Sequence, residues 1–131
     1  MTTPYNMTDY EKEYREFTWD VPEAFNFAGH VIDKWAQDPD KLAMFWVDDN
    51  GREEKLTFHQ LSVASKKLAN VLASQGIVQG DVVILVLPRN IEWWITVTAC
   101  IRMGAMVAPG TTQLTAKDLE FRSNKSGAAC I

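Results

Sequence analysis

The sequence predicts an α/β fold, in which an N-terminal helix and a short β-hairpin precede a β-α-β-α-β portion of a parallel sheet. The run over residues 82–87 is apolar at every position, as is typical of a parallel strand covered on both faces. From Asp81 onward, strand-like and helical segments alternate, which implies crossover connections within one sheet. The sequence ends at Ile131 within a third strand-like segment, so we expect this portion to belong to a larger, truncated domain.

The length of 131 residues suits one domain with its own core. Hydrophobic residues make up 47% and charged residues 23% of the chain, as in an ordinary globular protein. We expect an irregular arm over residues 1–20, a helix, hairpin and second helix over 21–80, and the parallel α/β portion over 81–131. Residues 1–16 are rich in acidic side chains and have no apolar core, which argues against a secretory or transit peptide and predicts a cytoplasmic location.

The first helix is predicted to begin after Asn26, its candidate N-cap. It is predicted to end at Asp38-Pro39, because proline pushes its predecessor out of the α region. Between these limits an apolar stripe recurs every fourth residue, at Phe27, Val31 and Trp35, with Ala28 and Ile32 beside it.

A hairpin and a second helix are predicted next. Residues 43–47 and 55–57 are β-prone and flank Asn50-Gly51, a pair that supplies the positive φ angles of a tight turn. Thr57 and Gln60 have the spacing of a capping box, and Gly76 marks the end of the helix with apolar Ile77 behind it. The apolar stripe of this helix consists of Leu61, Ala64, Leu68 and Leu72.

In the parallel portion, Pro88 ends the first strand, and a helix over Ile91–Met103 follows. Gly104 marks the end of this helix. A second strand is predicted over residues 106–108, a helix over 115–123, and a third strand from Ala128.

Several classes of function are disfavoured. A net charge of -4 argues against nucleic-acid binding, and Lys66-Lys67 lies on the polar face of a helix, where a solvated surface is the simpler interpretation. His30 and His59 lie on different helices without a cysteine or carboxylate at ligand spacing, so no metal site is predicted. The sequence also lacks a G-x-x-x-x-G-K-[ST] phosphate loop and a G-x-S-x-G nucleophile motif.

The cysteines and the paired tryptophans are interpreted as packing residues. Cys100 and Cys130 lie in apolar surroundings, far apart in sequence, which favours core packing in a reducing compartment over a disulfide. Trp93-Trp94 is compatible with a membrane-interface belt or a stacking platform, but the helix is too short to span a bilayer, and core packing is favoured. The helix is apolar on nearly all sides, so without a cover beyond the sheet it predicts self-association.

The segment Pro109-Gly110-Thr111-Thr112-Gln113 follows a parallel strand and precedes a helix, the place where open α/β sheets bind ligands. Backbone N–H groups there are able to receive an anion. The simpler alternative is a turn needed only for chain reversal, and the spacing alone favours that alternative.

In their order and spacing, these segments resemble the acyl-CoA synthetases of the adenylate-forming (AMP-binding) superfamily, most closely the medium-chain branch. The residues that carry the resemblance are Phe25-Asn26-Phe27-Ala28, Val31-Ile32-Asp33-Lys34-Trp35-Ala36, Leu56-Thr57-Phe58, Gln60-Leu61, Gln79-Gly80-Asp81, Leu87-Pro88-Arg89, Glu92-Trp93-Trp94, Cys100-Ile101-Arg102-Met103-Gly104 and residues 109–118.

The resemblance implies a ligase of fatty acid metabolism that joins a carboxylic acid to coenzyme A. ATP and Mg²⁺ would first form an acyl-adenylate, from which the CoA thiol displaces AMP. The family's catalytic motifs do not occur in this chain, so the resemblance implies no catalytic residue here. It assigns one CoA contact, Gln113, whose amide both donates and accepts hydrogen bonds.

As the N-terminal part of the large AMP-binding domain, the chain is expected to be inactive alone and to bind none of these cofactors tightly. Its expected partners are the remainder of that domain, the C-terminal domain that it lacks, and a small carboxylic acid, with neither nucleic acid nor membrane. The alternative is a small stand-alone α/β module for ligand binding or interaction, without catalysis.

Overall fold

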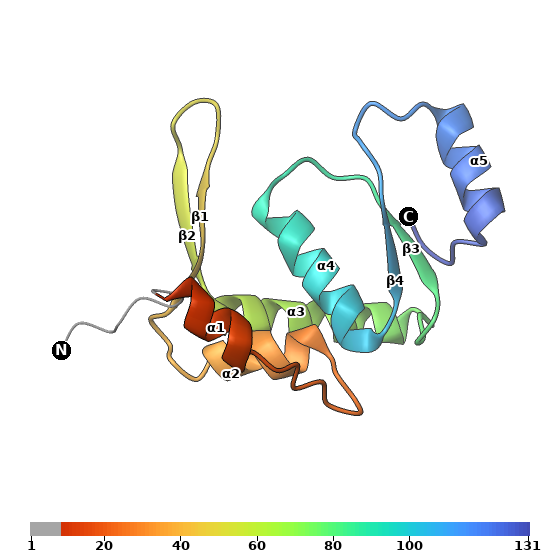
Figure 1. The fold of residues 1–131 in the computed structure, drawn as a ribbon. Helices are drawn as coiled ribbons and strands as arrows, with labels where there is room; N and C mark the ends of the chain where they lie inside the picture. The colour runs from red at the N-terminus through yellow and green to blue at the C-terminus, as the bar shows by residue number, and fades with distance from the viewer. Residues whose placement is uncertain (1–8) are drawn as a thin grey trace.

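A computed structural model of the chain describes residues 9–131 (Figure 1). Of the expected irregular arm, residues 1–8 lie outside the described residues. The rest contains α1, a helix over Tyr10–Glu16, so the expectation of an irregular arm is wrong there. The Asp9 side chain caps α1 by accepting a hydrogen bond from the backbone N–H of Lys12 at 3.1 Å. No residue of α1 is buried, which explains why hydrophobic periodicity does not reveal the helix.

The predicted first helix is confirmed as a π-helical turn, η1, over Ala28–Ile32, which continues into α2 over Asp33–Trp35. The Asn26 side-chain oxygen accepts hydrogen bonds from the N–H groups of Ala28 (3.0 Å) and Gly29 (3.2 Å), as expected of an N-cap. The buried residues are those beside the predicted stripe, not those of the stripe itself. Ala28 is 0% and Ile32 5% exposed, whereas Phe27 and Trp35 are exposed, because the smaller side chains let η1 contact α3 and α4.

The hairpin is confirmed, with β1 over Leu42–Val47 and β2 over Glu53–Thr57 in antiparallel pairing. The Asp48 carboxylate closes its turn by accepting hydrogen bonds from the N–H groups of Asn50 and Arg52, both at 2.8 Å. Gly51 adopts a φ of 78° in this turn, a conformation that glycine tolerates without strain. The hairpin projects away from the helices (Figure 1).

Helix α3, over Phe58–Ser74, has both predicted ends. Thr57 and Gln60 form the capping box. At the other end the N–H of Ile77 bonds the carbonyl of Leu72 at 3.1 Å, and the N–H of Gly76 bonds that of Ala73 at 3.0 Å, which is a Schellman motif.

The β-α-β-α order is confirmed: β3 over Val82–Leu85, α4 over Ile91–Met103, β4 over Met106–Pro109 and α5 over Ala116–Ser126. Strands β3 and β4 are parallel, with Val82 opposite Met106. Helix α5 continues three residues beyond its predicted end at Ser123, to Ser126, and Gly127 in the left-handed conformation ends it.

The third strand is present as one parallel bridge between Val83 and Cys130. The backbone N–H of Ile84 donates to the Cys130 carbonyl, and that of Ala129 to the Val82 carbonyl, both at 2.9 Å. Cys130 packs against a core of Ile77, Val83, Cys100 and Ala105. Both cysteines are free thiols, as the sequence analysis expected.

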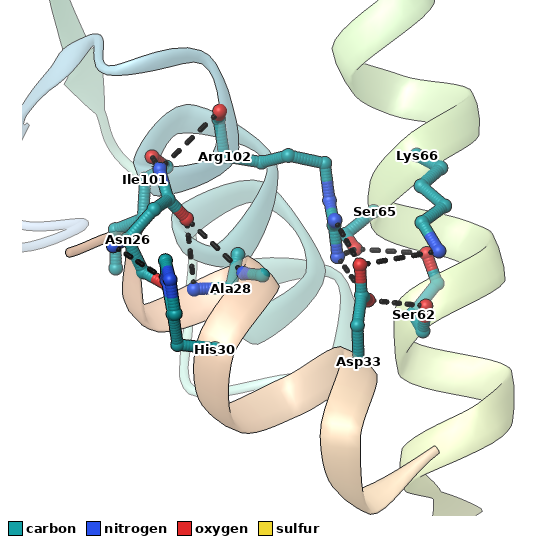
Figure 2. Close-up of polar contacts among 10 residues, drawn as sticks. Asn26, Ala28, His30, Asp33, Ser62, Ser65, Lys66, Ile101 and Arg102 are labelled. Carbon is teal, nitrogen blue, oxygen red and sulfur yellow. Dashed lines mark hydrogen bonds and ion pairs between the residues drawn. The ribbon is translucent and has the colours of Figure 1, made fainter. Parts of the chain in front are cut away.

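A polar cluster joins α2, α3 and α4, and we call it the Asp33 cluster (Figure 2). Arg102 donates to both Asp33 carboxylate oxygens, at 2.8 and 2.9 Å. Such a two-pronged pair fixes the relative orientation of the helices that carry it. The same carboxylate accepts a hydrogen bond from the Ser62 hydroxyl at 2.7 Å and pairs with the Lys66 ammonium at 3.2 Å, and Arg102 also donates to the Ser65 hydroxyl at 3.3 Å.

These bonds hold the pKa of the Asp33 carboxyl well below its ordinary value of 3.8, with the Arg102 hydrogen bond as the largest cause. Burial opposes this lowering. Lys66 forms an ion pair while its side chain stays 52% exposed, in keeping with the interpretation of Lys66-Lys67 as part of a solvated face. Two cations face the one carboxylate in this cluster, and Arg102 Nε is buried without a hydrogen-bond partner among the described residues.

The helix carrying the paired tryptophans is incompletely covered. The Trp94 side chain is 42% exposed and Trp93 is half-buried, so the favoured core packing is wrong for Trp94 within this chain. The two rings contact each other edge to face, with centroids 4.8 Å apart. No helix among the described residues is long and apolar enough to cross a membrane.

Candidate functional site

A cleft of about 490 Å³ opens where β3 and β4 end. Parallel strands place their carboxyl ends at one edge of the sheet, so the two loops that follow them meet there. The volume falls within the roughly 300–1,000 Å³ of small-molecule sites. The cleft is lined by Leu87, Pro88, Arg89, Trp93, Pro109, Gly110, Thr111 and Thr112.

The first wall of the cleft comes from the loop between β3 and α4. Asn90 begins α4 by accepting a hydrogen bond from the Trp93 N–H on its side-chain oxygen, at 3.1 Å. The Arg89 carbonyl accepts a hydrogen bond from the Trp46 indole N–H at 2.8 Å, which ties the hairpin to this loop. The Arg89 guanidinium lies over the Trp93 ring, 4.5 Å from its centroid, in cation–π contact.

The second wall comes from the loop between β4 and α5. The Gly110 N–H bonds the Leu85 carbonyl at 2.9 Å, which continues the ladder between the strands by one step. A Cβ atom at residue 110 would lie 2.6 Å from Leu114 Cδ1, so a side chain there would require the Leu114 side chain to move. Thr111 and Thr112 follow and are exposed, with hydroxyls that both donate and accept hydrogen bonds.

Helix α5 begins immediately after this wall. Thr115 caps it, and the Asp118 carboxylate accepts hydrogen bonds from the Thr115 N–H at 2.9 Å and from the Thr115 hydroxyl at 2.7 Å. The hydrogen bond from the Thr115 hydroxyl is the largest cause that lowers the pKa of the Asp118 carboxyl. The capping box therefore fixes where the loop ends and the helix starts.

Gln113, the residue singled out in the sequence, lies on the second loop next to the cleft but outside its lining. Its side chain is exposed, and its N–H points to the Thr111 hydroxyl at 3.3 Å. His30 and His59 are both exposed and lie away from the cleft, and the described residues contain no group of three or more potential metal ligands.

Sequence reasoning missed Arg89 and Trp93 as partners in one site. Both residues belong to segments that resemble the acyl-CoA synthetases. No spacing rule, however, predicts contact between a residue after a strand and the third residue of the next helix. The usable signal was the Leu87-Pro88-Arg89 end of an apolar strand, since charged residues at such ends face the ligand edge of a parallel sheet.

Comparison with known proteins places this architecture in a family. The model of the AMP-binding enzyme family matches residues 32–131, from the end of η1 to the third strand. The chain belongs to the AMP-binding enzyme family. The match spans both loops of the cleft and all of the parallel portion.

Curated relatives of this AMP-binding family member are acyl-CoA synthetases by name. The mitochondrial acyl-coenzyme A synthetase ACSM3 of Homo sapiens is 43% identical over 136 residues, which cover 98% of this chain and 23% of the relative. The mitochondrial ACSM5 of Rattus norvegicus is 47% identical over 109 residues, which cover 78% of this chain and 19% of the relative. The chain thus spans about a quarter of the length of the relatives it matches.

Solved structures support the same placement. The acyl-CoA synthetase of Brucella canis is 29% identical with a TM-score of 0.74, covering 92% of this chain and 22% of that one. The fatty acid AMP ligase from Legionella pneumophila has a TM-score of 0.73 at 21% identity, over 83% of this chain and 20% of that one, and shows the fold alone.

Proposed function

We propose that this chain is the N-terminal part of the large domain of an acyl-CoA synthetase. In the proposed reaction a carboxylic acid, medium in chain length, reacts with ATP to give an acyl-adenylate and pyrophosphate, and the CoA thiol then displaces AMP. The observation that carries the proposal is the 43% identity to an acyl-coenzyme A synthetase over 98% of this chain. Residues beyond this chain would supply the ATP and Mg²⁺ sites, because the catalytic motifs of the family do not occur in this chain.

Within that enzyme, the residues of this chain have two roles. The helices around the Asp33 cluster are scaffold. The cleft at the ends of β3 and β4 is one wall of a ligand site, and Gln113 at its margin contacts CoA through its side-chain amide. An amide in that position suits the polar pantetheine or nucleotide of CoA, because it offers both a donor and an acceptor.

A chimera tests the proposed function. The matching N-terminal segment of human ACSM3 is replaced by this chain, and acid-dependent pyrophosphate release and thioester formation are measured with ATP, Mg²⁺ and CoA. We expect an active chimera, whereas the 131-residue chain alone releases no pyrophosphate. A folded but inactive chimera, or activity of the chain alone, contradicts the proposal.

Gln113→Ala tests the CoA contact in the same chimera. Loss of one or two hydrogen bonds to CoA should raise the KM for CoA by about 3- to 10-fold and leave the KM for ATP unchanged. Gln37→Ala is the matched control, because Gln37 is an exposed residue outside the lining of the cleft. Equal effects of the two substitutions would rule out a contact at Gln113.

We also propose that the remainder of the same domain covers the apolar side chains left exposed here, including Trp94, Phe121 and Ile131. The isolated chain should then self-associate in size-exclusion chromatography and bind a hydrophobic dye, and the chimera should do neither. A monodisperse chain that binds no dye and binds a nucleotide tightly would instead support the stand-alone module.

The proposed location is the cytoplasm, on the acidic character of the first 16 residues. The names of the curated relatives give a mitochondrial location for those proteins. Fractionation of cells that express the tagged native gene separates the two compartments, and recovery in the mitochondrial fraction would contradict the proposal.

A further inference from the structure

Arg89 has an arrangement that differs from that of the paired arginines. Arg102 and Arg52 form ion pairs with Asp33 and Glu54, whereas the described residues place no carboxylate within ion-pair distance of Arg89. Its guanidinium is held by the Trp93 ring instead, and its carbonyl is fixed by the Trp46 indole. Arg89 therefore lines the cleft as a positioned cation whose charge is not neutralised.

The surroundings of Arg89 favour an anion. The opposite wall offers the Thr111 and Thr112 hydroxyls, and Gly110 keeps that wall free of a side chain. The cleft also lies at the N-terminal end of α4, where the helix dipole favours negative charge. Glu92, the acidic residue of that first turn, lines a different cavity, beneath the hairpin.

A phosphate group matches this set of donors. The planar guanidinium presents parallel N–H groups that bind two phosphate oxygens at once, and threonine hydroxyls are able to complete the shell. Stacking on Trp93 restricts the arginine before the ligand arrives, which lowers the entropic cost of binding. A carboxylate would fit the guanidinium, but it would leave more of the surrounding donors unused.

We propose that Arg89 binds a phosphate group in this cleft and that the phosphate belongs to the nucleotide end of CoA. The choice of CoA over ATP rests on the proposed function, in which Gln113, on the loop that forms the opposite wall, contacts CoA. Arg89 is then a specificity-determining residue that separates CoA from phosphate-free thiols such as pantetheine. Trp93 positions the guanidinium and Trp46 positions the loop.

Calorimetric titration of the chimera with human ACSM3 tests this inference. The ligands are CoA, ATP and pantetheine, and Arg89→Gln is compared with Arg122→Gln, which removes the same charge from an exposed position on α5. We expect Arg89→Gln to weaken CoA binding by about 10-fold or more and leave pantetheine binding unchanged, since a hydrogen bond between charged groups is lost. The Arg122→Gln chimera should bind CoA as the unaltered chimera does, and the affinity of the Arg89→Lys chimera should fall between the two.

Two results in an active chimera overturn the inference: equal weakening by Arg89→Gln and Arg122→Gln, or a loss of ATP binding in place of CoA binding. The kinetics of the chimera distinguish a folding defect from the loss of a contact with CoA. There, Arg89→Gln should raise the KM for CoA with kcat and the KM for ATP retained, whereas a structural defect would alter all three. An active chimera in which Arg89→Gln changes nothing overturns the role of Arg89 and leaves the proposed function standing.

Discussion

The helical base and the sheet end of this molecule are stabilised in different ways. The base, made of η1, α2, α3 and α4, is joined by directional bonds: the Asp33 cluster and the Asn26 amide, which donates to the Ile101 carbonyl at 2.8 Å (Figure 2). The sheet end, made of β3, β4, the Cys130 bridge and α5, relies on apolar burial that this chain only partly provides, and the Phe121 side chain is 68% exposed.

The difference teaches where precision is needed. A bidentate ion pair fixes how α4 crosses α2, and the first turn of α4 carries Trp93 and follows Arg89. The base therefore determines the geometry of the cleft. The sheet end exposes apolar surface that further polypeptide can cover. Apolar contacts are sufficient there, because they depend little on direction.

The largest effect is expected from Arg102→Met. It leaves the Asp33 carboxylate between α2 and α3 without its main partner, so we expect a loss of about 3 kcal/mol in the free energy of unfolding. Urea denaturation followed by circular dichroism measures this loss. Arg122→Met, on exposed α5, should stay within about 0.5 kcal/mol. Similar losses for both would remove the distinction between base and sheet end.

Asp33→Asn should cost about 2 kcal/mol at pH 7, since the amide loses the charge and replaces one of the two acceptor oxygens by an N–H₂ donor. The folded carboxyl has a pKa below its ordinary value of 3.8, so the unfolded chain binds the proton first on acidification. The stability that the charge provides is complete above about pH 5 and falls as the pH drops below 4. Stability measured against pH should therefore show the two curves converging in acid. Parallel curves down to pH 2 would contradict this role.

Asn26→Ala should cost about 1–2 kcal/mol, because one side chain both caps η1 and bonds the end of α4. Asn90→Ala, which removes only the cap of α4, should cost about 1 kcal/mol by the same measurement. A smaller loss at Asn26 than at Asn90 would mean that the tie between η1 and α4 contributes nothing to the base.

The smallest effect is expected at the sheet end. Phe121→Ser on exposed α5 should change the free energy of unfolding by less than about 0.5 kcal/mol and should reduce dye binding. A loss above about 1 kcal/mol would show that α5 packs more firmly than its exposure indicates, and the contrast between the two regions would weaken.

The fold was largely predictable because its elements have local signals. Thr57 with Gln60, Gly76 with Ile77, and Gly104 mark helix ends through backbone hydrogen bonds that involve neighbours in sequence. The helix α1 was missed since it buries nothing. The buried face of η1 was misjudged because a π-helical turn changes the period on which the stripe was read.

The polar features were beyond sequence reasoning for a different reason. Asp33, Ser62 and Arg102 are far apart in the chain, and each has the ordinary spacing of a surface residue. Their bonds depend on how three helices cross, which hydrophobic periodicity does not determine. The same holds for Arg89 and Trp93 in the cleft, whereas the loop at Gln113 was foreseen because it follows a strand end.

The single bridge at Cys130 gives this chain two thiols with different protection. Cys100 is 0% exposed on α4, whereas Cys130 is half-buried at the sheet edge, where the Cys130 carbonyl and the Ala129 N–H each form one backbone hydrogen bond with β3. Local opening of the last strand should therefore release Cys130 to a thiol reagent while Cys100 stays protected until the base unfolds. The two labelling rates, measured by mass spectrometry, report separately on opening of the sheet edge and unfolding of the base. A polypeptide segment that covers the edge would slow the labelling of Cys130 only.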